Sequence, residues 1–196
     1  MPATGGAAPR QPGAYIDRDG VIIEERGYAH RAEDLALLPG AAGALLKLQQ
    51  AGYRLIVVTN QSGIARGLYT EAAYRDFTEQ LRQRLSGEGV CLDAIEYCPH
   101  LPDAALPDYR RDCDCRKPRP GMLLRAAVRL GIDLGQSVCI GDRRTDLEAG
   151  RAAGVGRCFL VRSGVPLGEQ DAALADGVYA DLAECVRAML RVPATA

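Results

Sequence analysis

The sequence has almost no excess charge of either sign, because 24 lysines and arginines stand against 25 aspartates and glutamates and leave a formal net charge of −1. That balance argues against a broad nucleic-acid-binding surface, so we expect no nucleic-acid partner. No stretch approaches the apolar run that spans a bilayer, so we expect no membrane association either. The opening MPATGGAAPRQPG lacks the apolar core of a secretory signal, which predicts a flexible tail over residues 1–12 and a cytoplasmic protein.

Internal repeats are absent as well, and 47% of the residues are apolar, as in ordinary globular proteins. The 196 residues suit one domain with a sizeable core, which we expect over residues 13–192. Disulfides rarely persist in the cytoplasm, so the seven cysteines need another explanation. Four of them stand among apolar neighbours and are predicted to be small buried side chains: Cys91, Cys139, Cys158 and Cys185.

Apolar runs alternate with amphipathic stretches along the chain. The runs predict strands over residues 14–16, 53–58, 93–98, 137–142, 157–161 and 177–180. The amphipathic stretches predict helices over residues 39–52, 70–85, 120–131, 144–153 and 181–191. This alternation implies right-handed crossovers, so the predicted fold class is α/β, with a parallel sheet covered by helices on both faces.

Ligands of such sheets bind at the carboxyl ends of the strands. Four chemically capable residues fall where predicted strands end, namely Asp17, Thr59, Cys98 and Asp142. We therefore expect one edge of the sheet to gather two acidic segments, a polar loop and a group of cysteines.

The acidic segments favour a metal ion. Asp17 and Asp19 stand close together in DRDG, and like charges so near each other are costly unless a cation lies between them. Asp142 would join them from a later strand, and carboxylates around a small, hard cation indicate Mg²⁺. Taken singly, DRDG is also typical of a turn and GD of a helix cap.

Two further segments favour an anionic ligand. TNQSG, residues 59–63, offers a hydroxyl, amides and backbone N–H groups after the most apolar strand, although taken alone it is better explained as a polar loop in which Gly63 makes the turn. CRKPRPG, residues 115–121, places three cations before a helix whose dipole favours negative charge there, and a bound phosphate would remove that conflict. A solvated basic loop remains the alternative for the second segment.

The remaining cysteines form a pattern with one histidine. Cys98 and His100 are followed by Cys113 and Cys115, and four such ligands match a closed tetrahedral zinc site. The loop over residues 98–115 has no apolar core of its own, so a structural zinc ion would hold it folded. The alternative is a set of free thiols.

The strings DRDGVI, VVTNQSG, CRKPRPGM and GDRRTD, in this order, resemble the four motifs of the haloacid dehalogenase (HAD) superfamily of phosphohydrolases. TNQSGIARG, YCPH, CDCRKP and PGMLL resemble more particularly the heptose 1,7-bisphosphate 7-phosphatases, and the likeness runs from about residue 14 to 190. The resemblance implies a Rossmann-like HAD core without a large cap domain, with the zinc loop shaping the pocket. It also implies a monomer that acts on a small sugar bisphosphate with Mg²⁺ as catalytic and Zn²⁺ as structural cofactor.

The resemblance further implies roles for individual residues. Asp17 is expected to attack phosphorus and form an aspartyl-phosphate, while Asp19 exchanges the proton with the leaving oxygen and then with water. Mg²⁺ would be held by Asp17, the backbone carbonyl of Asp19 and Asp142, and Asp146 would orient its waters. The expected phosphate- and substrate-binding residues are Glu25, Arg26, Gly27, Tyr28, Thr59, Asn60, Gln61, Ser62, Arg116, Lys117 and Arg143.

Two positions depart from the family pattern, because Val21 stands where a threonine is usual and Arg143 where a lysine is common. Two alternatives stay open. A histidinol-phosphate phosphatase shares the zinc loop, but its cationic substrate calls for an acidic pocket, whereas Arg116 favours a second anionic group. A non-catalytic zinc-binding interaction module would have no need of the acidic residues.

Overall fold

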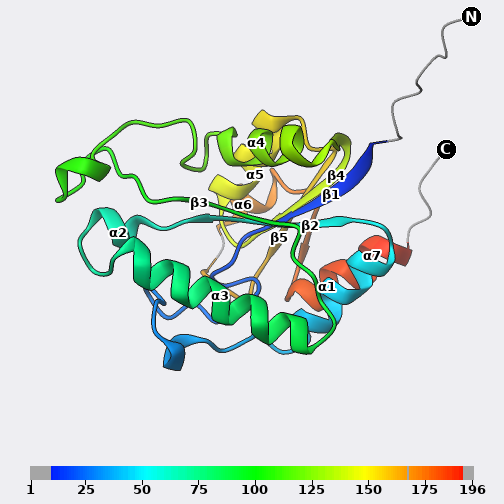
Figure 1. The fold of residues 1–196 in the computed structure, drawn as a ribbon. Helices are drawn as coiled ribbons and strands as arrows, with labels where there is room; N and C mark the ends of the chain where they lie inside the picture. The colour runs from blue at the N-terminus through cyan, green and yellow to red at the C-terminus, as the bar shows by residue number, and fades with distance from the viewer. Residues whose placement is uncertain (1–9, 167, 192–196) are drawn as a thin grey trace, which may run out of the picture.

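The computed structural model describes residues 10–166 and 168–191, whose strands form one six-stranded sheet (Figure 1). Every neighbouring pair of strands is parallel, and their order across the sheet is β3-β2-β1-β4-β5-β6. The predicted α/β class is therefore confirmed. The strands are β1 (Gln11–Ile16), β2 (Arg54–Asn60), β3 (Ala94–Cys98), β4 (Ile132–Gly141), β5 (Arg157–Val161) and β6 (Gly177–Tyr179).

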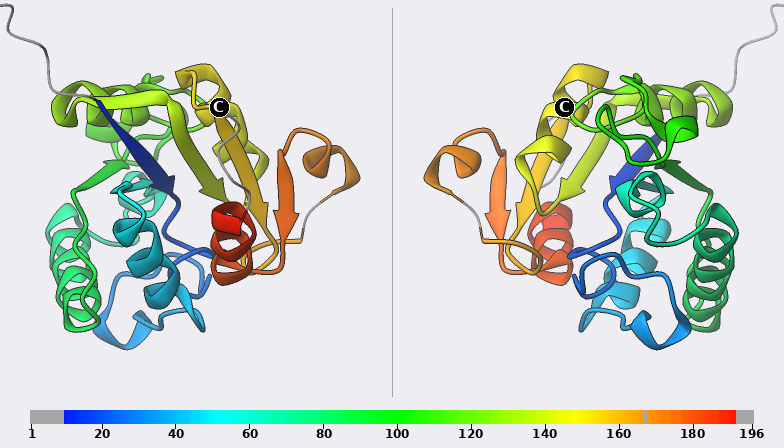
Figure 2. Two further views of the ribbon diagram at one scale, coloured as in Figure 1. Left: turned by 90° about the vertical axis from the view of Figure 1, so that its right-hand side faces the viewer. Right: turned by 90° about the vertical axis from the view of Figure 1, so that its left-hand side faces the viewer.

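Helices cover both faces of this sheet, as Figures 1 and 2 show. One face carries α1 (Ala41–Gln50), α3 (Glu71–Gly87) and α7 (Leu182–Arg191). The other carries α4 (Gly121–Leu130) and α5 (Arg144–Ala153). Short helical turns complete the described elements: α2 (Ser62–Ala65), α6 (Glu169–Ala172), η1 (Ala32–Asp34) and η2 (Pro107–Tyr109).

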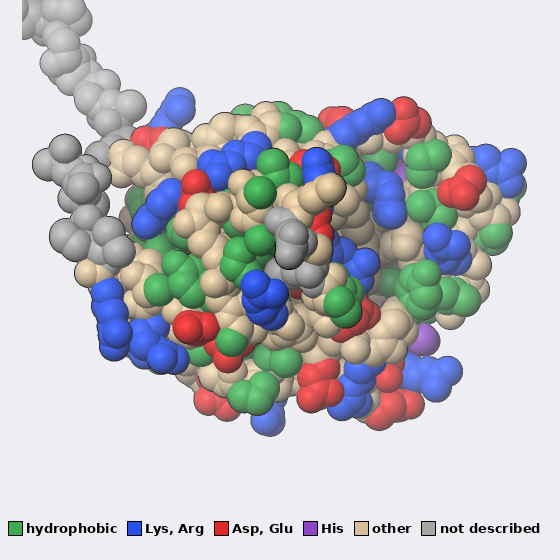
Figure 3. All heavy atoms as spheres, turned by 180° about the vertical axis from the view of Figure 1, so that it is seen from behind, with side chains coloured by type: hydrophobic (Ala, Val, Ile, Leu, Met, Phe, Trp, Pro, Cys, Tyr) green, Lys and Arg blue, Asp and Glu red, His purple; other side chains and the backbone are tan. Residues whose placement is uncertain are grey.

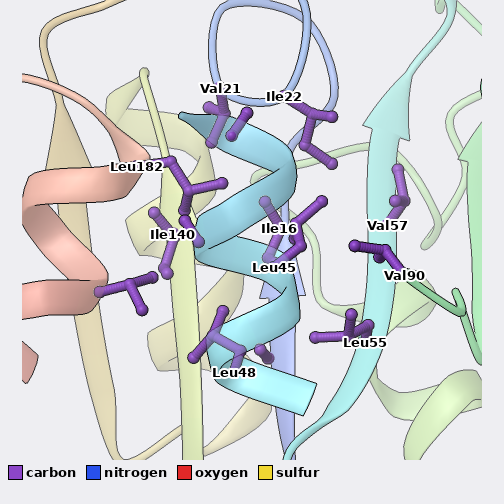
Figure 4. Close-up of a cluster of buried hydrophobic side chains, with 14 of the residues drawn as sticks. Ile16, Val21, Ile22, Leu45, Leu48, Leu55, Val57, Val90, Ile140 and Leu182 are labelled. Atoms are coloured by element: carbon purple, nitrogen blue, oxygen red, sulfur yellow. The ribbon is translucent and has the colours of Figure 1, made fainter. Parts of the chain in front are cut away.

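Successive side chains of the central strands point to opposite faces of the sheet, so the hydrophobic core consists of two clusters, one on each face. On β2, Leu55 and Val57 pack on the α1 side, whereas Ile56 and Val58 pack on the α4 side. Because successive side chains of a strand point to opposite faces, a run that is apolar throughout can serve both layers. Figure 4 shows Leu45 of α1 over the sheet in the first of these clusters.

Some boundaries differ from the sequence-based prediction. β4 begins at Ile132 rather than residue 137, because its first half, in which apolar and polar residues mix, starts by pairing with Gln11 and Pro12 of β1. These two residues were predicted to lie in a tail, of which residues 1–9 fall outside the described part. The prediction for Cys91 was wrong, since its side chain is exposed, whereas Cys139, Cys158 and Cys185 are buried.

Between β1 and α1 the chain forms only the single turn η1, so the described residues contain no separate cap domain at this position. A loop with η2 in it connects β3 to α4 and lies beside α2 (Figure 1). Acidic and basic side chains are interspersed over the face seen in Figure 3. Across the described ranges, each helix is too short or too polar to cross a lipid bilayer.

Candidate active site

The site lies where the strand order reverses. From β1 the chain passes to β2 and β3 on one side, and from β4 it passes to β5 and β6 on the other, which opens a crevice at the carboxyl ends of β1 and β4. Ile16 is paired with Ile140, so Asp17 and Asp142 follow the two strands into this crevice. The backbone N–H of Asp17 donates to the carbonyl of Ile140 at 3.0 Å and extends the ladder by one residue.

A cavity of about 430 Å³ occupies the crevice. Most of the predicted site residues line it, together with Arg18, Tyr69 and Thr145, which sequence reasoning missed. Arg18 stood inside the DRDG motif, but nothing near Tyr69 in the sequence singled it out. The predicted residues on the wall are Asp17, Asp19, Glu25, Gly27, Tyr28, Thr59, Asn60, Gln61, Ser62, Arg116, Lys117, Arg143 and Asp146.

The prediction for Arg26 is not supported, because this side chain is absent from the cavity wall. Its guanidinium donates to the Oε2 atom of Glu24 at 2.6 and 2.9 Å, and both side chains are exposed. A neighbouring carboxylate thus holds Arg26 at the surface, which the position of the residue in the sequence did not indicate.

Three carboxylates cluster at the base of the cavity, where Asp17 and Asp146 line the wall and Asp142 lies fully buried and is not part of the wall. Oxygen atoms of Asp17, Asp142 and Asp146 lie within 4.8 Å of one another. Burial and the neighbouring carboxylates raise the pKa of Asp17 to about 8, against the opposing effect of Lys117. Burial and then Asp146 raise the pKa of Asp142 to about 7, although Arg143 and Lys117 oppose the rise. The raised pKa values mean that Lys117 and Arg143 do not fully offset the negative charge of these carboxylates.

The surroundings of Asp142 indicate whether a cation fits among these carboxylates. Its side chain is fully buried, and neither carboxylate oxygen has a hydrogen-bond partner among the described residues. The only ion-pair partner among the described residues is Arg143, whose Nε lies 3.8 Å from Asp142 Oδ1. A buried carboxylate without hydrogen bonds is costly, and carboxylate oxygens readily bind a hard divalent cation. The residues present therefore fit a Mg²⁺ ion between Asp17 and Asp142.

Lys117 stands beside the acidic cluster. Its Nζ atom donates to Asp17 Oδ1 and Asp146 Oδ1, both at 2.6 Å, and to the carbonyl of Val58 at 2.7 Å. Burial lowers its pKa, but the two carboxylates more than reverse this effect and leave the pKa raised, so the ammonium stays charged. Asn60 fixes the backbone of Lys117 through its side-chain amide, with bonds of 3.0 and 3.1 Å.

Asp19 points away from the acidic cluster. Its carboxylate accepts hydrogen bonds from Arg18 and Gln61 and has 18% of its side chain exposed to the cavity. Because the side chain is engaged in this way, only the backbone carbonyl of Asp19 is available for the predicted metal contact.

The rim of the cavity is basic. Arg143 Nη2 donates to Glu25 Oε2 at 3.1 Å, so the segments after β1 and β4 meet across the rim. Arg116 Nη1 donates to the carbonyl of His100 at 3.4 Å and has no carboxylate partner among the described residues. Tyr28 projects beside them in a left-handed conformation with φ of 62°, which non-glycine residues seldom adopt.

The predicted zinc ligands come together next to this rim. The three thiol sulfurs of Cys98, Cys113 and Cys115 are separated by 3.1 to 3.5 Å, and His100 Nδ1 lies 3.3 Å from the Cys115 sulfur. A tetrahedron with Zn–S bonds of about 2.3 Å has edges of about 3.8 Å, so the sulfur atoms need only move apart by a few tenths of an ångström to surround one ion. The four side chains therefore fit a closed zinc site.

Two glycines enclose the Asp142 carboxylate. A Cβ atom at Gly20 would lie 2.7 Å from Asp142 Oδ2, and one at Gly164 would overlap the same oxygen. Ser163 ties the two segments together by donating to the carbonyl of Gly20 at 2.7 Å. The loop after β5 thus closes directly over the candidate metal ligand, and only glycine leaves room there.

We expect the Gly164→Ala variant to weaken Mg²⁺ binding by roughly tenfold, because the added methyl group displaces Asp142 from its ligand position. Isothermal titration calorimetry with Mg²⁺ measures this directly. Gly168→Ala is the matched control, since a Cβ there meets its nearest neighbour at an ordinary 3.4 Å. Equal affinities of the two variants would contradict the role given to Gly164.

Known proteins that resemble this chain are HAD-type phosphatases, in agreement with the arrangement of the site. A family model described as HAD-hydrolase-like matches residues 114–185. The D-glycero-beta-D-manno-heptose-1,7-bisphosphate 7-phosphatase of Photorhabdus laumondii is 44% identical over 179 residues, which cover 90% of this chain and 95% of the relative. The alpha-type enzyme of the same organism is 42% identical and is matched over 92% of its length, with 85% of this chain covered.

A solved structure agrees with these relatives. The D,D-heptose 1,7-bisphosphate phosphatase of B. bronchiseptica, complexed with magnesium and phosphate, superimposes with a TM-score of 0.77 at 33% identity. The match covers 92% of this chain and 98% of that structure. The identities and coverages are high enough to establish descent. The chain belongs to the HAD-type heptose 1,7-bisphosphate phosphatase family.

Proposed function

We propose that this protein hydrolyses the C7 phosphate of D-glycero-D-manno-heptose 1,7-bisphosphate and releases heptose 1-phosphate, a precursor for surface glycans such as the lipopolysaccharide core. The observation that carries the proposal is the convergence of Asp17, Asp142 and Lys117 at one sheet edge, where Asp17 and Lys117 line the cavity and an oxygen of buried Asp142 lies within 4.8 Å of one of Asp17. Relatives of both anomeric types have nearly equal identity to this chain, so the proposal covers either anomer.

Asp17 is the nucleophile. Its carboxylate attacks phosphorus and forms an aspartyl-phosphate, which divides one difficult displacement into two easier ones. Asp19 protonates the leaving sugar oxygen in the first step and takes a proton from the attacking water in the second. Lys117 and Thr59 bind the oxygens of the phosphoryl group, where a charged ammonium and a hydroxyl offset developing negative charge.

Mg²⁺ would be held by Asp17, by the backbone carbonyl of Asp19 and by Asp142, and Asp146 would orient the waters of the ion. When bound, the ion offsets the repulsion between an anionic nucleophile and an anionic phosphate. The unpartnered oxygens of buried Asp142 support this assignment.

Zn²⁺ bound by Cys98, His100, Cys113 and Cys115 has a structural role, because protein atoms fill all four positions. It also bears on the substrate, since Arg116 donates to the carbonyl of the ligand residue His100. Folding of the loop and placement of Arg116 are thereby linked.

The basic rim supports a bisphosphate over histidinol phosphate. Arg116 has its charge unpaired at the mouth of the cavity, and a guanidinium is suited to grip a phosphate in two-pronged fashion. Arg143 is the second candidate cation there, although Glu25 shares its charge in this structure. A cationic amine would meet repulsion from both arginines.

We further propose that residues 13–192 act as a single phosphatase domain, as a monomer in the cytoplasm. All seven cysteines are free in the structure, which is consistent with a reducing compartment.

The test is phosphate release from four substrates: the α and β anomers of heptose 1,7-bisphosphate, heptose 7-phosphate and histidinol phosphate. We expect kcat/KM for at least one bisphosphate anomer to exceed that for histidinol phosphate by about a hundredfold or more, because an unmatched charge in the site is costly. Arg116→Gln should reduce the preference for the bisphosphate over heptose 7-phosphate. Faster turnover of histidinol phosphate would overturn the substrate assignment and leave the phosphatase chemistry intact.

A further inference from the structure

Both oxygens of the Asp19 carboxylate are engaged by neighbouring side chains. Arg18 donates from Nε to Oδ2 at 3.1 Å and from Nη2 to Oδ1 at 2.9 Å. Gln61 donates from Nε2 to Oδ2 at 3.1 Å. A carboxylate gripped at both oxygens by a rigid, planar guanidinium has little freedom to rotate.

Arg18 is itself anchored in the interior. Only 2% of its surface is exposed, and Nη2 also donates to the carbonyl of Ala29 at 3.2 Å. The ring of Phe77 lies 4.9 Å from its guanidinium carbon and that of Tyr74 lies 5.8 Å away. Burying a charge costs several kcal/mol unless it is paired, and the buried guanidinium of Arg18 forms its ion pair with Asp19. The arginine is therefore held firmly in place and can orient that carboxylate.

Tyr69 fixes the second donor. Its hydroxyl donates to Gln61 Oε1 at 2.6 Å, and Arg18 Nη2 donates to the same oxygen at 3.2 Å. Together they orient the amide so that Nε2 reaches Asp19 Oδ2 at 3.1 Å and Thr59 Oγ1 at 2.8 Å. The Tyr69 ring is confined on two sides, because His30 stacks on it at 4.7 Å and a Cβ atom at Gly63 would overlap it. This chain of contacts reaches Asp19 from a segment far from the DRDG motif.

We propose that Arg18 and Tyr69 are positioning residues that hold the Asp19 side chain in the orientation from which its protonated carboxyl group delivers the proton to the leaving oxygen and becomes the carboxylate with which Arg18 and Gln61 pair. The inference rests on the acid role given to Asp19 under the proposed function. Neither residue was assigned a role by the sequence motifs. Both act through Asp19, Arg18 by the two-pronged pair and Tyr69 through Gln61.

A leaving group that is a weak acid needs the proton, whereas a more acidic one departs with little help. Poor placement of Asp19 therefore penalises phenyl phosphate more than p-nitrophenyl phosphate, two substrates of similar shape that share no sugar contacts. The ratio of their kcat/KM values reports the phosphoryl-transfer step alone, and a general loss of folded protein lowers both values equally.

The experiment measures that ratio, and kcat/KM for heptose 1,7-bisphosphate, in Tyr69→Phe and Arg18→Lys. Tyr69→Phe keeps the packed ring, and Arg18→Lys keeps the charge but loses the two-pronged geometry. We expect kcat/KM for phenyl phosphate to fall by about tenfold in Tyr69→Phe and more in Arg18→Lys, with less than about a threefold loss for p-nitrophenyl phosphate. Tyr15→Phe is the matched control, since its buried hydroxyl has no hydrogen-bond partner among the described residues.

Asp19→Asn separates this inference from the proposed function. If Asp19→Asn changes the ratio of the two aryl phosphates but neither Arg18→Lys nor Tyr69→Phe does, the positioning role is overturned and the acid role of Asp19 stands. If Asp19→Asn itself leaves the ratio unchanged, the acid role falls and the positioning role falls with it. Equal losses for both aryl phosphates in the folded Tyr69→Phe variant would also overturn the inference.

Discussion

Asp17→Asn is expected to abolish phosphate release while leaving the protein folded. An amide lacks the negative charge and nucleophilicity of the carboxylate, so no aspartyl-phosphate forms, and losses on the order of 10⁴-fold or more follow removal of a nucleophile. The fold should persist because two electrostatic effects oppose each other. The substitution removes the pair with Lys117, and it also removes repulsion from Asp142 and Asp146.

The measurement is phosphate release from heptose 1,7-bisphosphate, with circular dichroism and thermal melting to verify folding. Asp76→Asn is the control, since this aspartate is exposed on α3 outside the cavity. Full activity of the Asp17→Asn protein would exclude the covalent mechanism whatever the control shows.

Cys113→Ser is expected to release the bound zinc and unfold the loop over residues 98–115. Structural zinc contributes a large share of the folding free energy of a loop whose apolar contacts are as few as those of Leu101 and Ala104 with Ala65 and Tyr109. If the variant loses about 3 kcal/mol of stability, a protein of this size melts roughly 10 °C lower. Because Arg116 is tied to the carbonyl of His100, KM for the bisphosphate should rise as well.

Metal analysis of the purified wild-type protein should find about one zinc ion per chain that survives mild chelation. Hydrogen exchange should show faster exchange across the loop of Cys113→Ser, with the sheet still protected. Cys91→Ser is the control, because Cys91 is an exposed thiol outside the cluster. A wild-type protein without zinc would contradict the structural metal site.

The helices and strands were largely predictable because their signals are local. β5 was predicted with its observed bounds, Arg157–Val161, from a run of apolar residues. Tertiary pairing decided one exception. The first half of β4 is not a continuous apolar run, and its strand begins where Ile132 and Asp133 pair with Gln11 and Pro12. The helix α2 escaped prediction because four residues are too few to show a period.

In the active site, too, the sequence determined some features and tertiary contacts determined others. The sequence by itself determined which acidic and basic residues reach the sheet edge, because an apolar run fixes where a strand ends and the parallel order brings those ends together. Only the tertiary structure decided where their side chains point. Arg26 lies at the surface against Glu24, and Asp19 is turned towards Arg18 and Gln61, because side-chain direction depends on partners supplied by other parts of the chain.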